Sequence, residues 1–175
     1  MNDCSTKKKI VICRHTDYPN SLELGGAYTT ETGTRKLQSL PLRQHLDGCE
    51  SFILKTSPAL WAVETAIVLN NEHGWLPDGV TAENVEYSLL SGSDIAADND
   101  RVAHDAQQFW GGRDALIIVT HLEVCYWLPK RIARDQGWPE DGEWQKYVGL
   151  DRGMAAVLDL TEQTISVVQS PPEDT

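Results

Sequence analysis

The sequence predicts an α/β fold of three layers, with helices on both faces of a central, mostly parallel sheet. Short apolar runs alternate along the chain with longer segments in which apolar residues recur at helical spacing. The runs at 9–13 and 115–119 are apolar almost throughout, as expected of strands that are buried on both faces. Helical segments follow the strand-like runs, and such segments return the chain for parallel pairing.

The first half of the chain shows clear start signals for its helices. Thr30 and Thr32 offer hydroxyls that can satisfy the free amides of a first helical turn. Ser57 followed by Pro58 is a second start signal, because proline is favoured just inside a helix. The predicted elements are a strand at 9–13, a loop at 16–29, a helix at 30–46, a strand at 51–55 and a helix at 59–71.

The second half of the chain continues the alternation and then changes to a hairpin pattern. Gly74 and Pro77 interrupt the chain, and Gly111-Gly112 ends a helical segment. The helix after the strand at 115–119 carries Val124 and Leu128 on one face. The predicted elements are a strand within 80–87, a loop at 89–99, a helix at 100–110, a strand at 115–119 with a helix after it, a loop at 137–149, and a terminal hairpin at 154–160 and 164–168.

Length and charge limit the classes of protein to be considered. The 175 residues are predicted to form a single domain over 1–175, with frayed ends at 1–7 and 170–175. Hydrophobic residues make up 41% of the chain, which argues against a disordered protein. A net charge of −11 predicts neither a nucleic acid nor a membrane surface as partner, and any functional arginine must act in a local pocket.

The apolar segments and the cysteines indicate the compartment. No run approaches the roughly 18 apolar residues of a membrane helix, and the run at 10–13 is too short for a signal peptide. A cytoplasmic location is therefore expected. The cysteines are widely scattered, so they are expected to be reduced thiols rather than a zinc site; they are Cys4, Cys13, Cys49 and Cys125.

Three predicted strands end in residues that are capable of chemistry. Arg14-His15 follows the first strand, Thr56-Ser57 the second, and Thr120-His121 the strand at 115–119. In an open α/β sheet, ligands bind beyond the carboxyl ends of the strands. The residues and the fold therefore indicate the same edge of the sheet.

These side chains suit a phosphate group. The planar fork of Arg14 can hold two phosphate oxygens, and a neutral His15 can attack phosphorus to give a phosphohistidine that water then cleaves. His121, if protonated, would stabilise the charge that develops during transfer. Ser57 and the amides at the start of the helix after it would donate further hydrogen bonds.

Four segments together resemble the histidine phosphatase superfamily, which includes phosphoglycerate mutases and short phosphohistidine phosphatases. I-V-I-C-R-H-T, with Arg14-His15, is similar to the opening R-H-G or R-H-T motif of that family, and T-T-E-T-G is similar to the helix start that follows. T-S-P-A-L-W-A-V-E-T-A resembles the S-P-L-x-R-A-x-Q-T-A segment, and I-I-V-T-H resembles the strand with the second histidine. The order and spacing agree over about residues 8–160.

The resemblance implies a phosphoglycerate mutase-like fold and a set of roles. His15 would be the phosphorylated nucleophile, and Arg14 and His121 would bind the phosphate. The substrate would be a small phosphorylated molecule or a phosphoprotein, and the enzyme a phosphoric monoester or phosphohistidine hydrolase. No metal and no other cofactor is implied. The chain length is similar to that of the short phosphohistidine phosphatases.

Trp61 stands where the family segment carries a second phosphate-binding arginine. An indole offers one neutral donor, whereas a charge-assisted bond is about twice as strong as a neutral one. Trp61 either packs on its helix or narrows the pocket, and we expect it to line the pocket. Arg35, Arg113 and Arg152 are candidates for replacing this charge, and the sequence does not choose between them.

The proton donor is left open between several residues. Glu86 and Asp94 lie in the stretch that is similar to the family's acid-bearing region, and Ser91 can occupy the acid position itself. Asp17 is a further candidate because it follows the nucleophile by two residues. A phosphoramidate substrate would need only a weak acid, because its leaving nitrogen is basic.

The segment from Cys125 to Arg131 has the C-x5-R spacing of cysteine-dependent phosphatases. Such loops need small residues, whereas Tyr126 and Trp127 are bulky, so we interpret the segment as a helix. Lys130, Arg131 and Arg134 would then form a solvated face that can attract an acidic partner. Two hypotheses remain: a histidine-type phosphatase, and a binding module of the same fold that has lost turnover.

Overall fold

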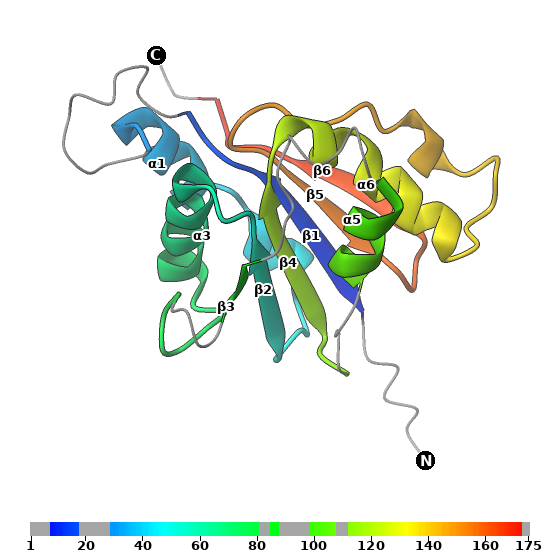
Figure 1. Ribbon diagram of the computed structural model, residues 1–175, viewed down its shortest axis with the longest axis horizontal. Coiled ribbons are helices and arrows are strands. Elements are labelled where there is room, and N and C mark those ends of the chain that lie inside the picture. The colour runs from blue at the N-terminus through cyan, green and yellow to red at the C-terminus, as the bar shows by residue number, and fades with distance from the viewer. Residues whose placement is uncertain (1–7, 18–28, 81–84, 88–98, 108–111, 173–175) are drawn as a thin grey trace.

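The computed structural model describes residues 8–17, 29–80, 85–87, 99–107 and 112–172. Its described strands form one sheet in the order β3-β2-β4-β1-β5-β6 (Figure 1). Strands β1 to β4 pair in parallel, whereas β5 is antiparallel to β1 and β6 is antiparallel to β5. The strands are β1 (Lys9–Arg14), β2 (Phe52–Thr56), β3 (Val85–Tyr87), β4 (Ala115–Thr120), β5 (Ala155–Asp159) and β6 (Thr164–Val168).

Helices cover both faces of the sheet, which confirms the predicted three-layer architecture. Helices α1, α2 and α3 share a core with one face of the sheet, and α5 and α6 share a second core with the opposite face (Figure 1). The helices are α1 (Glu31–Gln38), α2 (Leu42–His45), α3 (Leu60–His73), α5 (Asn99–Gln107) and α6 (Leu122–Asp135), with a 3-10 turn at Glu143–Lys146. No helix in the described part of the chain is long and apolar enough to span a membrane.

The central strand β4 contributes to the cores on both faces of the sheet. All six of its residues are buried. Ile117 faces the core beneath α1 and α3, and Ile118 faces the core beneath α5 and α6. An apolar run without alternation is therefore the sequence of a strand with a helix layer on each side.

The prediction of one helix over 30–46 is wrong. The chain leaves the helical path after Gln38 and begins the short α2 at Leu42. Pro41 lacks an amide hydrogen, and it disfavours a helical conformation at Leu40. Thr30 nevertheless caps α1 as expected, since its Oγ1 accepts a hydrogen bond from the Gly33 amide at 3.0 Å.

Other boundaries differ by a few residues. The second strand begins at Phe52, and the strand within 80–87 is limited to Val85–Tyr87. Helix α3 begins at Leu60 with Ala59 as its N-cap, so Ser57 is not the cap; its Oγ instead accepts from the Ala59 amide at 3.3 Å. The terminal hairpin is confirmed as β5 and β6. The expected loop at 89–99 lies almost entirely outside the described residues, and the loop at 137–149 contains the 3-10 turn.

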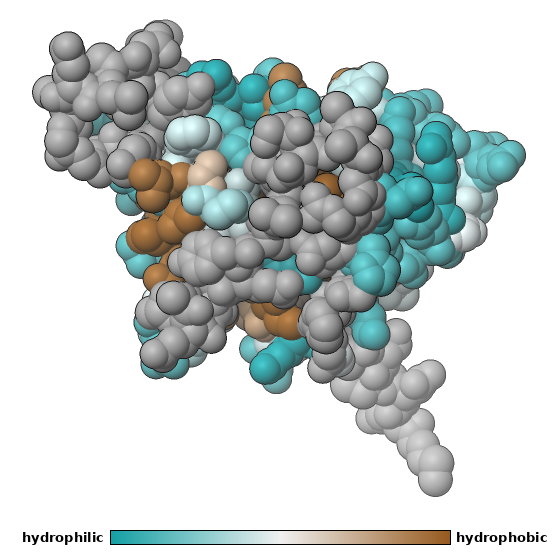
Figure 2. All heavy atoms as spheres, viewed as in Figure 1, coloured by the Kyte–Doolittle hydropathy of each residue, from teal (hydrophilic) through white to brown (hydrophobic). Residues whose placement is uncertain are grey.

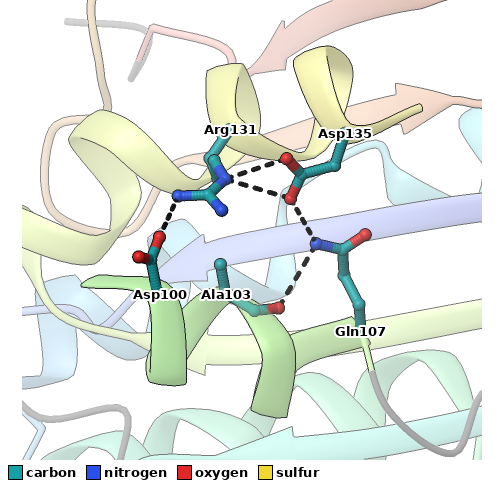
Figure 3. A network of polar contacts seen from close by, with 5 residues as sticks. All are labelled: Asp100, Ala103, Gln107, Arg131 and Asp135. Carbon is teal, nitrogen blue, oxygen red and sulfur yellow. Dashed lines mark hydrogen bonds and ion pairs between the residues drawn. The ribbon is translucent and has the colours of Figure 1, made fainter. Parts of the chain in front are cut away.

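Arg131 joins α5 to α6 (Figure 3). Its guanidinium binds Asp100 from α5 and, at 2.9 Å, Asp135 on its own helix, while Gln107 donates to Asp135 at 3.1 Å. Arg131, which the sequence places on a solvated face, is thus already paired with two carboxylates of the chain.

The exposed side of α3 is more apolar than the rest of the visible surface. Figure 2 shows apolar surface over this helix, where Leu60 and Ile67 are exposed. The same helix buries Ala62, Ala66 and Leu69 against the sheet. Leu60 immediately precedes Trp61, so this surface begins next to the candidate site.

Candidate active site

The three chemistry-bearing strand ends meet at one edge of the sheet, as the sequence predicts. Strand β4 lies between β1 and β2. The His15 amide donates to the Thr120 carbonyl at 2.9 Å, and the Ser57 amide donates to the Val119 carbonyl at 3.0 Å. The sheet ladder therefore continues into the loops, and it fixes His15 and Ser57 beside the end of β4.

Three rings form the centre of this edge. The ring centroids of His15 and His121 are 5.1 Å apart, and the two planes meet nearly edge to face. The indole of Trp61 is 6.2 Å from each of the two imidazoles. Trp61 comes from the first turn of α3, and this places its ring beside both imidazoles.

His15 is held in one tautomer. Its Nδ1 is 2.9 Å from the Thr16 carbonyl, which can only accept, so Nδ1 carries the hydrogen and Nε2 carries the lone pair. The pKa of His15 is lowered from 6.5 to about 4, chiefly by burial, with the Thr16 hydrogen bond opposing the shift and the nearby charges of His121, Arg14 and Arg152 adding to it. A neutral imidazole with its lone pair at Nε2 is the form that a phosphorus nucleophile requires.

This burial makes stability depend on pH. The unfolded chain takes up a proton on His15 near pH 6.5 and the folded chain only near 4, so folded-state stability falls as the pH falls between these values. We expect His15→Gln to make the dependence shallower in this window, by up to about 1.4 kcal/mol per pH unit. Urea unfolding at several pH values between 7 and 4.5 measures this difference. Parallel curves for the two proteins would contradict the depressed pKa.

His121 is the N-cap of α6 and has two neighbours in the site. Its Nδ1 lies 3.5 Å from the Trp61 Nε1, which can only donate, so Nε2 carries the hydrogen and donates to Ser57 Oγ at 2.7 Å. Burial lowers the pKa of His121, and the Arg14 charge lowers it further, against the effect of Glu123. His121 is thus a neutral donor in this structure, and its expected cationic role requires a proton that an anionic ligand would favour.

Arg14 has one guanidinium nitrogen anchored and another buried without a partner. Its Nη1 donates to the Leu150 carbonyl at 3.0 Å. Its Nε is buried and has no hydrogen-bond partner among the described residues. A buried donor without an acceptor is costly.

The proton-donor candidates differ in how far the structure describes them. Asp17 binds Arg152 Nη1 at 3.1 Å and lies 3.9 Å from Lys36 Nζ, so its carboxylate is paired with two cations. Glu86 lies in β3, in register with Lys55, and its side chain is outside the described residues, as are Asp94 and Ser91.

The structure separates the three arginines proposed to replace the charge at position 61. Arg113 precedes the amino end of β4, at the edge of the sheet opposite to the site, so its assignment is wrong. Arg152 binds Asp17, and its charge acts on the His15 ring. Arg35 lies on α1 and lines a cavity that Arg152 also lines.

Sequence reasoning missed the residues that hold the loop after His15. Thr65 Oγ1 accepts from the Thr16 amide at 3.3 Å and donates to the Trp61 carbonyl at 2.8 Å, which ties this loop to α3. Gly33 allows α1 to approach closely, because a Cβ there would lie 2.4 Å from Thr16 Oγ1. Thr65 and Gly33 both fall within the motifs quoted above, but spacing alone does not reveal these contacts.

Cys125 lies within α6, which confirms the helical interpretation of the C-x5-R segment. Burial raises its pKa well above the ordinary value. A buried, protonated thiol on a helix cannot serve as a phosphatase nucleophile. The cysteine-dependent alternative is thereby removed.

Comparisons with known proteins place the fold. No family model and no curated protein sequence matches the chain. Among solved structures, phosphoglycerate mutase from Plasmodium falciparum has a TM-score of 0.55 at 16% identity, over 97% of each chain. The protein histidine phosphatase SixA, complexed with tungstate, has a TM-score of 0.55 at 16% identity, over 93% of this chain and 97% of that one. Alpha-ribazole phosphatase from Shigella flexneri has a TM-score of 0.51 at 16% identity, over 93% of this chain and 96% of that one. The chain therefore has the phosphoglycerate mutase-like fold that these histidine phosphatase superfamily structures share.

Proposed function

We propose that the protein is a phosphatase of the histidine type. The observation that carries this proposal is the state of His15: it is buried and neutral, its Nδ1 is fixed by the Thr16 carbonyl so that the lone pair is at Nε2, and the charge of Arg14 acts on its ring. A bond forms between Nε2 and phosphorus while the bond from phosphorus to the leaving oxygen or nitrogen breaks. Water then attacks the phosphohistidine and releases phosphate.

The surrounding side chains have separate roles in this reaction. Arg14 supplies the positive charge that pairs with the phosphate oxygens. His121 donates from Nε2, and it stabilises the transferring group more strongly once it has taken up a proton. The leaving atom needs a proton, and Asp17, Glu86 and Asp94 remain the candidates for supplying it. The imidazole itself is the nucleophile, so the reaction needs no metal and no other cofactor.

The substrate is a small phosphate monoester or a phosphohistidine protein. The fold likeness to alpha-ribazole phosphatase supports a small phosphate monoester. The likeness to the protein histidine phosphatase SixA supports a phosphohistidine protein. The neutral His121 and the missing arginine suit a phosphoramidate, whose basic leaving nitrogen needs little help from an acid. A phosphohistidine is such a phosphoramidate.

A trapping experiment tests the covalent step. Protein mixed with radiolabelled para-nitrophenyl phosphate and quenched in alkali is expected to carry an acid-labile phosphoryl group on His15, located by peptide mapping. The Cys125→Ser variant should label equally, because its sulfur takes no part. Labelling at Cys125, or neither label nor product release at high enzyme concentration, would contradict the proposal.

A second candidate is a binding module that holds a phosphorylated ligand or a protein without turnover. The observation in its favour is Trp61, whose Nε1 is directed at His121 Nδ1 where the family segment has an arginine. The site then has one fewer positive charge to stabilise a transferring phosphoryl group. Restoring that charge distinguishes the two candidates, as described in the Discussion.

A further inference from the structure

Thr65 is a fully buried polar residue of α3, on the same helix as Trp61 and one turn after it. Its hydroxyl has a single hydrogen, which it donates to the Trp61 carbonyl at 2.8 Å, because a carbonyl oxygen can only accept. A lone pair of Thr65 Oγ1 is therefore left for the Thr16 amide, which donates to it at 3.3 Å. The direction of both hydrogen bonds is thus fixed by the donors and acceptors available.

Thr16 connects this hydroxyl to the candidate nucleophile. The Thr16 amide is bound by Thr65, and the Thr16 carbonyl accepts from Nδ1 of His15 at 2.9 Å. Thr16 is itself fully buried, so water does not compete for either group. A chain of hydrogen bonds therefore runs from the Trp61 carbonyl through Thr65 and the Thr16 backbone to the His15 ring.

The other neighbours of Thr16 pack against it without orienting its backbone. Gly33 and Gly153 lie on its side chain, since a Cβ at these glycines would be 2.4 Å and 3.4 Å from Thr16 Oγ1. Thr16 Oγ1 is buried and has no hydrogen-bond partner among the described residues. The side chain of Thr16 therefore adds no directed contact there, and the bond from its amide to Thr65 is its directed contact with α3.

The position of the Thr16 carbonyl matters because it selects the tautomer of His15. A neutral imidazole has one N–H and one lone pair, on different nitrogens. The carbonyl keeps the hydrogen on Nδ1. A carbonyl that turned away would leave a buried N–H without an acceptor, which is costly. The hydrogen would then also occupy Nε2, where the ring presents a donor to phosphorus in place of a lone pair.

We propose that Thr65 is a positioning residue of the candidate active site. Its hydroxyl holds the Thr16 backbone so that the Thr16 carbonyl keeps His15 in the tautomer with the lone pair at Nε2. The inference rests on the proposed function, because this tautomer matters for catalysis only if the His15 ring attacks phosphorus. The same hydroxyl binds the Trp61 carbonyl, so one buried group sets the backbone of the nucleophile loop and that of the first turn of α3.

Thr65→Val tests the proposal, because it removes the hydroxyl and keeps the branched shape of the side chain. We expect kcat for para-nitrophenyl phosphate to fall at least about tenfold and KM to change by less than about twofold, since the orientation of the nucleophile is lost rather than phosphate binding. Thr65→Ser keeps the hydroxyl, and its kcat should stay within about twofold of wild type.

Nitrogen NMR of isotopically labelled protein at neutral pH reports the tautomer directly. Wild type should show a protonated Nδ1 and an unprotonated Nε2 for His15. We expect the two signals to move towards each other in Thr65→Val, as both tautomers become populated, and to keep their wild-type positions in Thr65→Ser. A purely structural role for Thr65 would not predict this change.

Leu69→Ala is the matched control. Leu69 is fully buried one turn farther along α3, so its truncation costs stability while the Thr65 hydroxyl stays in place. Its NMR signals and kcat should match those of wild type, measured below its unfolding temperature. If Thr65→Val does not fold, Thr65→Ala provides the same two measurements.

Two results would overturn the inference. The first is a folded Thr65→Val or Thr65→Ala variant with the wild-type tautomer and kcat. The second is an equal loss in Thr65→Ser or Leu69→Ala, which would show that the hydroxyl is not the determinant. Failure of the proposed function gives a different result, because wild type would then hydrolyse no substrate while the NMR comparison still reports whether Thr65 sets the His15 tautomer.

Discussion

Replacement of His15 by alanine is expected to lower kcat/KM for para-nitrophenyl phosphate at least about 1,000-fold, as removal of a nucleophile does in other covalent enzymes. The residue contributes the attacking lone pair at Nε2, and no neighbour can replace it: His121 has its Nδ1 beside the Trp61 indole and its Nε2 directed at Ser57. Steady-state hydrolysis by wild type and variant measures the loss.

The matched control is His104→Ala. His104 is exposed on α5, on the other face of the sheet, so hydrolysis should stay within about twofold of wild type. Circular dichroism and urea unfolding establish that His15→Ala is folded. A folded variant that keeps a tenth of the activity would exclude His15 as the nucleophile.

Trp61→Arg is expected to raise kcat/KM for the same substrate by about 10–100-fold. Hydrogen bonds to charged groups contribute about 1.5–3 kcal/mol, and a guanidinium adds both charge and a second donor. The change also removes the indole that is directed at His121 Nδ1, 3.5 Å away. The two measurements are the rate of para-nitrophenyl phosphate hydrolysis and the affinity for inorganic phosphate, which we expect to increase.

Trp61→Phe separates charge from packing. It removes the indole donor but keeps an aromatic ring against the core that Trp61 contacts, and its activity should lie within about threefold of wild type. A large gain in Trp61→Arg from a nearly inactive wild type would favour the binding module. High wild-type turnover would exclude that alternative, and a folded Trp61→Arg without any gain would show that the missing charge does not limit the site.

The three layers of the fold, and the edge of the sheet that carries the candidate site, are predictable from short patterns of apolar residues in the sequence. Residues 115–119 are apolar without alternation, which specifies burial on both faces, and β4 is the strand that lies between the two cores. Because β1, β2 and β4 are parallel neighbours, their carboxyl ends share an edge. Arg14, His15 and His121 could therefore be placed together before any coordinates were known.

The contacts between distant segments could not be predicted in the same way. Arg152 is 135 positions from Asp17 in the chain, and nothing in the sequence distinguishes it from Arg113. The neutral state of His121 depends on burial and on the position of Arg14, which sequence spacing does not fix. The break between α1 and α2 at Pro41 is predictable in principle, because proline is unfavourable inside a helix. The helical spacing of apolar residues on both sides of Pro41 nevertheless favours one continuous helix.

The backbone hydrogen bonds from His15 and Ser57 to the end of β4 have a consequence for the heat inactivation of the protein. The amides of these two residues belong to the same hydrogen-bonded ladder as the strands they follow. Amide hydrogens in such a ladder exchange with solvent through large cooperative openings rather than through fraying of a loop. We therefore expect the His15 and Ser57 amides to stay protected from exchange on heating until the central strands separate.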